Sequence, residues 1–176
     1  MPTIDFETRL LTIGSWTVLR LPESASARLP SRGQAMVEGT INGIPFRTPL
    51  EPDGRKSHWF RLDNAMLQAL KAAAGDTVRL SINPAKDWPE PEVSADFASA
   101  LAGAPEASAL WQDITPMARW EWIRWLRATG NSETRERRIE VCCSKLTAGE
   151  RRPCCWNRNM CTEPSVSKNG VLILPQ

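Results

Sequence analysis

Residues 20–37 read RLPESASARLPSRGQAMV, and residues 61–78 read RLDNAMLQALKAAAGDTV. A shift of 41 places superimposes identical residues in and just after the two stretches: Arg20 on Arg61, Leu21 on Leu62, Leu29 on Leu70, Val37 on Val78, Ile41 on Ile82 and Asn42 on Asn83. A repeat of this length indicates one supersecondary unit used twice, because two such units can bury the apolar faces that neither covers alone.

Alternating apolar and polar residues predict strands throughout residues 1–84. The segments are 3–13, 16–21, 35–41, 44–50, 58–62 and 77–82. Asn42-Gly43 indicates a tight hairpin, since both turn positions need a positive φ, and Asp63 or Asn64 can cap a helix that Gly75-Asp76 would end. Each repeat then reads as strand, short helix, glycine turn and strand. We expect the two repeats to close a small β-barrel about a pseudo-twofold axis.

The periodicity changes to that of helices after a proline-rich stretch. Residues 85–93 are the expected linker, because their prolines cannot donate to a strand ladder. Helices are expected over 94–102, 105–112, from about 115 onward, and over 132–146, which makes 94–150 a helical domain. Residues 151–176 have no clear period and form a cysteine-containing tail. The predicted fold class is α+β, with an N-terminal barrel and a C-terminal helical bundle.

Composition favours an ordinary globular protein. The 176 residues are 41% hydrophobic and 24% charged, with a net charge of +2. The first twenty residues carry Asp5, Glu7, Arg9 and Arg20 among short apolar runs, which is unlike a secretory signal or a membrane span. We therefore expect a cytoplasmic protein with reduced thiols, since five cysteines, four of them in vicinal pairs, do not suit a disulfide framework.

Charge is unevenly distributed along the second half of the chain. Residues 85–116 hold one base and six acids, whereas residues 117–158 hold ten bases and five acids. This swing is compatible with an anion-binding face, and equally with mutual neutralisation of the two stretches after folding.

Several segments resemble a known family. GTINGIPFRTPLEPDG, HWFRL and GDTVRLSI are similar to a small bacterial barrel of unknown function, and WEWIRWLRATGNSETRERRIE resembles the helical domain of the bacteriocin-protection, YdeI/OmpD-associated family. The likeness covers about residues 3–152. It implies a cytosolic protein with a role in tolerance to antimicrobial peptides or bacteriocins, with no catalytic residues to carry over and an unidentified partner.

The repeated unit also resembles, more distantly, the swapped-hairpin barrel of AbrB-like regulators. That likeness implies nucleic-acid binding as the alternative function. Residues 1–84 hold ten bases and eight acids without a dense basic stripe, whereas DNA binding needs several phosphate contacts.

Cysteine chemistry is one candidate activity. Cys154 and Cys155 lie near Arg151, Arg152 and Arg158, which would favour the thiolate and hence a redox role. A zinc site is less consistent with the sequence, because vicinal cysteines replace the usual C-x-x-C spacing. We predict no metal and no cofactor. Cys142 and Cys143 are explained by the packed face of a helix.

Ligand binding is the favoured activity. Arginine forks suit phosphate or carboxylate groups, and the single histidine lies next to a tryptophan on a predicted strand. The candidate ligand-binding residues are Arg135, Arg138, Arg151, Arg152, His58 and Trp59. The same arginines could instead form ion pairs with Glu133, Glu136 and Glu140 on a solvated surface. The sequence predicts a non-enzymatic protein that binds an anionic ligand or a protein or peptide partner; nucleic acid is the less favoured partner.

Overall fold

The computed structural model describes residues 2–127, 131–153 and 171–174. These residues divide into two compact units. One holds the chain up to Asp87 together with residues 171–174, and the other begins at Trp88.

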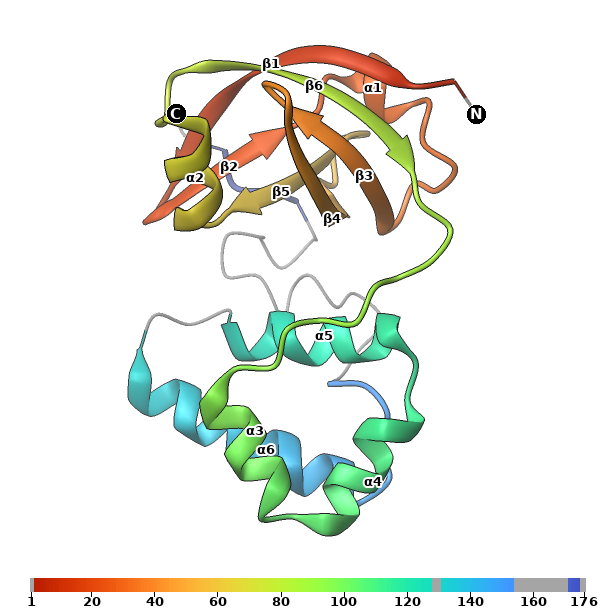
Figure 1. Ribbon diagram of the computed structural model, residues 1–176, viewed down its shortest axis with the longest axis vertical. Coiled ribbons are helices and arrows are strands. Elements are labelled where there is room, and N and C mark those ends of the chain that lie inside the picture. The colour runs from red at the N-terminus through yellow and green to blue at the C-terminus, as the bar shows by residue number, and fades with distance from the viewer. Residues whose placement is uncertain (1, 128–130, 154–170, 175–176) are drawn as a thin grey trace. The chain divides into compact units, whose positions relative to one another are not determined.

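The first unit is a closed β-barrel with strand order β1-β2-β5-β4-β3-β6 (Figure 1). Every pair of neighbouring strands is antiparallel. The strands are β1 (Ile4–Ile13), β2 (Trp16–Arg20), β3 (Ala35–Ile41), β4 (Ile44–Pro52), β5 (His58–Leu62) and β6 (Thr77–Pro84). The expected α+β class, with a barrel followed by helices, is confirmed.

Both repeats form a strand, a helix and a strand. The first is β2, α1 (Glu23–Ser26) and β3, and the second is β5, α2 (Asn64–Leu70) and β6. The strand order is symmetric between the two halves. Exchanging β1 with β4, β2 with β5 and β3 with β6 leaves the set of neighbouring strand pairs unchanged. A rotation axis relating the halves stays a prediction.

Local sequence explains the turns and helix ends of the barrel. Asn42 and Gly43 have φ values of 46° and 80°, as the predicted hairpin between β3 and β4 requires. Asp63 caps α2 by accepting a hydrogen bond from the backbone N–H of Met66. The helix ends at Leu70, earlier than predicted, because Lys71 adopts the left-handed conformation.

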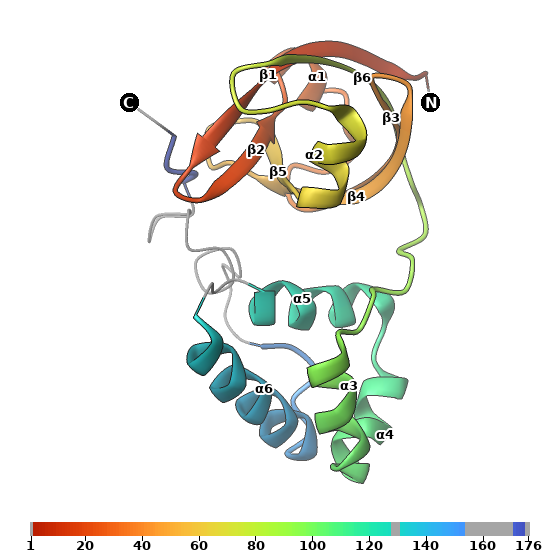
Figure 2. The same ribbon diagram turned by 60° about the vertical axis from the view of Figure 1, so that its left-hand side comes forward.

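Apolar residues from all six strands fill the barrel interior. The rings of Phe46 and Phe60 stack with centroids 5.6 Å apart. Helix α2 packs Met66, Leu67 and Leu70 against this core and lies over one end of the barrel (Figure 2). Each fully buried Leu, Ile or Phe stabilises the barrel by about 1.5–3 kcal/mol relative to an exposed side chain.

The second unit consists of helices α3 (Ala95–Ala102), α4 (Pro105–Asp113), α5 (Pro116–Arg127) and α6 (Ser132–Thr147). Helix α6 packs against the other three. The core includes Phe97 and Trp111, whose rings meet edge to face with centroids 5.1 Å apart. In the described part of the chain, no helix has the length and apolar character to cross a membrane.

Gly39 of β3 is paired with Ile82 of β6, and the β6 backbone lies close to it. A Cβ at this position would lie 1.9 Å from the backbone oxygen of Ser81 and 2.9 Å from Cα of Ile82. Backbone atoms cannot turn aside as a flexible side chain can, so the strands would have to separate.

We expect Gly39→Ala to lower the free energy of unfolding by about 3 kcal/mol, the upper end of the usual cost of overpacking. Gly33→Ala is the control, because its Cβ would be 3.5 Å from Oγ of Ser31 and should change stability by less than about 0.5 kcal/mol. Urea unfolding of both variants measures the difference. Equal losses of unfolding free energy in the two variants would show that the close approach of β6 does not exclude a side chain at position 39.

Candidate functional site

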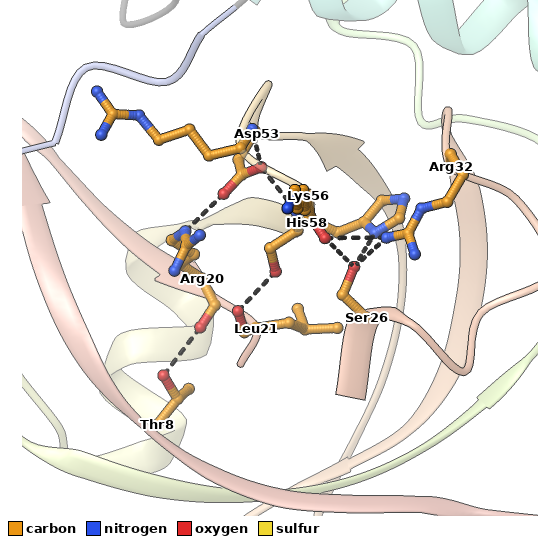
Figure 3. Close-up of polar contacts among 10 residues, drawn as sticks. Thr8, Arg20, Leu21, Ser26, Arg32, Asp53, Lys56 and His58 are labelled. Atoms are coloured by element: carbon orange, nitrogen blue, oxygen red, sulfur yellow. Dashed lines mark hydrogen bonds and ion pairs between the residues drawn. The ribbon is translucent and has the colours of Figure 1, made fainter. Parts of the chain in front are cut away.

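A buried carboxylate organises the turn between β4 and β5. Oδ1 of Asp53 accepts hydrogen bonds from the backbone N–H groups of Arg55 at 2.7 Å and Ser57 at 2.8 Å, and Oδ2 forms an ion pair with Nε of Arg20 at 2.6 Å (Figure 3). Burial raises the pKa of Asp53, but these hydrogen bonds and the charge of Arg20 outweigh it and hold the pKa below its ordinary value. Asp53 is therefore an anion that fixes the turn.

His58, the first residue of β5, lies beside this turn and is fully buried. Its Nε2 lies 2.7 Å from the carbonyl oxygen of Gly33, and its Nδ1 lies 2.7 Å from Oγ of Ser26. A carbonyl can only accept, so Nε2 carries the proton and Nδ1 accepts from the Ser26 hydroxyl. Burial lowers the pKa of His58 below its ordinary value; the Gly33 carbonyl opposes this shift and the charge of Arg32 adds to it.

Arg32 completes the polar network. Its Nη2 donates to Oγ of Ser26 at 2.9 Å and to the carbonyl oxygen of Lys56 at 3.0 Å (Figure 3). Next to it is a pocket of about 500 Å³. The pocket is lined by Glu23, Ala27, Arg32, Pro52, Gly54, Lys56 and Ser57. Two exposed cations thus face one carboxylate in a concave site.

Ser26 and His58 have the spacing of a nucleophile and its base, but their burial points to another role. Ser26 is fully buried, and its oxygen already accepts from Arg32 while its hydroxyl donates to His58. A nucleophile must reach the substrate, so this pair is better suited to holding α1 against β5. The accessible chemistry of the site is that of Arg32 and Lys56, which can bind an anion.

The structure places the predicted ligand residues His58 and Trp59 in different surroundings. Neighbouring residues of a strand point to opposite faces. His58 contacts Ser26 and Gly33, whereas Trp59 is buried in an apolar cluster with Ile13, Val18 and Leu172. The two side chains therefore do not form one site.

Arg135 of the predicted arginine cluster joins three helices. It forms an ion pair with Asp96 at 2.7 Å and donates to Oγ of Ser94 at 2.7 Å and to the carbonyl oxygen of Leu126 at 3.2 Å. The hydrogen bonds from Arg135 hold the pKa of Asp96 well below its ordinary range, and the carboxylate raises the pKa of Arg135.

The other three arginines also contact their own helical unit. Arg138 donates to the carbonyl oxygen of Trp125 at 2.6 Å and lies over its ring. Arg151 pairs with Asp113 at 2.8 Å, and Arg152 lies 3.5 Å from Oε1 of the buried Glu121. Arg135 pairs with Asp96 of α3 and Arg151 with Asp113 of α4, so each of these two guanidinium groups contacts a carboxylate of a different helix.

The predicted redox residues Cys154 and Cys155 lie outside the described residues. Cys142 is buried and Cys143 is half-buried, and burial raises the pKa of both thiols. Among the residues that the structure describes, no group of three potential metal-binding side chains occurs.

Sequence reasoning missed Ser26, Arg32, Asp53 and Lys56. Pro52-Asp53-Gly54 has the residue types of a turn, but this local pattern does not show that the carboxylate meets Arg20. Ser26 and His58 are 32 residues apart, and their contact depends on the pairing of β2 with β5.

The architecture is thus a small closed barrel followed by a helical domain. Residues 6–82 match the family model of a domain of unknown function (DUF1905). Residues 90–149 match the model described as "Bacteriocin-protection, YdeI or OmpD-Associated". These matches confirm the resemblance of the barrel and of the helical segment to the two families noted in the sequence. No curated protein matches the chain.

His58 should make the stability of the barrel depend on pH. Its pKa is lowered on folding, so on acidification below about pH 6.5 the unfolded chain takes up a proton that the folded chain does not. The free energy of unfolding should therefore fall by up to about 1.4 kcal/mol per pH unit until the folded pKa is reached.

Urea unfolding between pH 7 and 5.5 measures this slope, with His58→Gln as the comparison. Glutamine can donate to Gly33 and accept from Ser26 without titrating. The variant should lose most of the slope, and the single histidine resonance in the NMR spectrum should titrate below pH 6.5. A midpoint above 6.5, or an unchanged slope in the variant, would contradict the assigned neutral ring.

Proposed function

We propose that the chain is a non-enzymatic, cytoplasmic binding protein that helps bacteria tolerate antimicrobial peptides or bacteriocins. In this proposal the barrel pocket beside Arg32 and Lys56 receives an anionic group, such as a carboxylate or phosphate, of a protein, peptide or small-molecule partner. The family match supports the role, and the cations of the pocket support the chemistry.

The hydrogen bonds of Arg32 carry the proposal. Arginine has five N–H donors in a planar fork. The contacts with Ser26 and Lys56 use only Nη2 and hold the guanidinium at the pocket, and Nε and Nη1 form no hydrogen bond with an acceptor among the described residues. A fixed fork suits carboxylate and phosphate groups, because less motion is lost when the ligand binds.

Nucleic acid is a poorer fit to the barrel. Arg79 pairs with Glu7 at 2.8 Å, Arg47 lies 3.7 Å from Glu38, and Arg20 pairs with Asp53. Binding of a phosphate backbone requires several cations on one face, and these three are each next to a carboxylate. We therefore favour a single anionic group over a polyanion.

Lys56→Asn tests the pocket. Lys56 has a φ of 71°, a conformation that asparagine tolerates, so the change removes the cation without adding backbone strain. We expect inorganic phosphate to shift the amide resonances of residues 54–57, and the variant to bind about three- to fivefold more weakly, the usual worth of one exposed ionic contact. An NMR titration measures both effects.

Lys71→Asn is the matched control. Lys71 is also exposed and has a φ of 51°, but it does not line this pocket. The Lys71→Asn variant should bind phosphate with the same affinity as the unaltered protein. If phosphate shifts no resonance in residues 54–57, or if both variants weaken binding equally, the pocket is not an anion site.

Susceptibility to a cationic antimicrobial peptide tests the cellular role. Cells lacking the gene should be more susceptible, and the unaltered and Lys71→Asn proteins should restore tolerance better than Lys56→Asn. Unchanged susceptibility of the deletion strain would contradict the role, while salt-sensitive binding of DNA or RNA would favour the regulator instead.

A further inference from the structure

The described C-terminal residues 171–174 lie in an apolar groove on the barrel. Leu172 is fully buried there among Ile13, Val18 and Trp59. Its backbone N–H donates to the carbonyl oxygen of Asp53 at 2.8 Å. Figures 1 and 2 show this segment, in blue, against the barrel.

The segment alternates in the manner of an extended strand. Leu172 is buried, Ile173 is 53% exposed, and Leu174 is half-buried against the same cluster. A main-chain hydrogen bond combined with pockets for alternate side chains is how a peptide is recognised by strand addition.

The walls of the groove belong to paired strands of the barrel. Ile13 and Trp16 are paired in the hairpin of β1 and β2, and Trp59 is paired with Arg20 and Glu51 on neighbouring strands. Arg61 lies 4.4 Å above the ring of Trp16. A groove built on paired strands is available to any segment of suitable shape.

Trp59, which belongs to the apolar cluster around Leu172, carries a buried donor. Nε1 of Trp59 is buried and has no hydrogen-bond partner among the described residues. A buried donor is normally satisfied, so a bound segment with an acceptor within reach of Nε1 would satisfy it.

We propose that this groove binds an extended segment of another polypeptide with apolar side chains at alternate positions, and that residues 171–174 occupy it as an intramolecular competitor. The groove is a second site, separate from the anion pocket, although Asp53 and the pocket residues Gly54 and Lys56 share one turn. A tethered competitor is present at an effective concentration of about 1 mM. The partner must therefore bind tightly enough, or be concentrated enough, to displace it.

The test uses a protein truncated after Gly170 and a fluorescein-labelled peptide of residues 168–176. Fluorescence anisotropy should show binding to the truncated protein with a Kd of about 0.1 mM or lower, because a competitor at an effective concentration of about 1 mM then occupies about nine-tenths of the grooves. The full chain should bind the peptide at least tenfold more weakly, because its own segment competes. No binding to the folded, truncated protein, or equal binding to both proteins, would overturn the proposal.

Two altered peptides test the alternation. Leu172→Asp places a charge in the buried position and should abolish binding, whereas Ile173→Lys changes the exposed position and should leave affinity within about threefold. If both peptides bind with the same affinity, the groove does not distinguish the side chains at alternate positions. Lys56→Asn in the truncated protein should not alter peptide binding, so failure of the anion pocket and failure of the groove are distinguishable.

If the truncated protein does not fold, hydrogen exchange of the full chain tests whether residues 171–174 can leave the groove. A competitor must leave the groove without unfolding the barrel, so the amide of Leu172 should exchange at least 100-fold faster than that of Leu19 in β2. Exchange of both amides at the same rate would make residues 171–174 an integral part of the barrel and overturn the proposal.

Discussion

The buried carboxylate of Asp53 is the constraint on which the rest of the barrel site depends. It accepts from Arg20, Arg55 and Ser57, while its own backbone N–H and the carbonyl of Ser57 close the turn at 2.9 Å. Because the carboxylate is paired and hydrogen-bonded, burial does not neutralise it. Its stabilising contribution is present above the pKa of an unfolded aspartate, near 4, and is lost as the pH falls through the lower pKa of the folded protein.

This turn determines three features. It sets the start of β5 and so places His58 against Ser26 and Gly33. It supplies Gly54 and Lys56 to the anion pocket, and its first carbonyl accepts from Leu172. The pocket and the apolar groove therefore share one turn, so the charged and apolar ligand groups proposed for them would lie close together.

The sequence contained most of the fold but less of the site. Local signals were sufficient for the hairpin at Asn42-Gly43, for a cap at Asp63 or Asn64 and for the helices, because each depends on residues close in sequence. The repeat added the barrel, since related units must cover each other's apolar faces.

The site depends on contacts between distant residues. Arg135 was predicted as a ligand residue, but Asp96 is 39 residues away, and nothing local indicates that they meet. His58 and Trp59 were taken together although strand periodicity places them on opposite faces. Leu172 was assigned to a tail without clear period, because a short segment that packs on another element shows no repeat of its own.

Asp53→Asn tests the central claim most directly. The account predicts a loss of about 3 kcal/mol in the free energy of unfolding, as expected for breaking a buried ion pair, together with faster amide exchange at residues 55, 57 and 172. Asp63→Asn, which preserves a helix cap, should change stability by less than about 0.5 kcal/mol. Stability and exchange like those of the unaltered protein in Asp53→Asn would contradict the account.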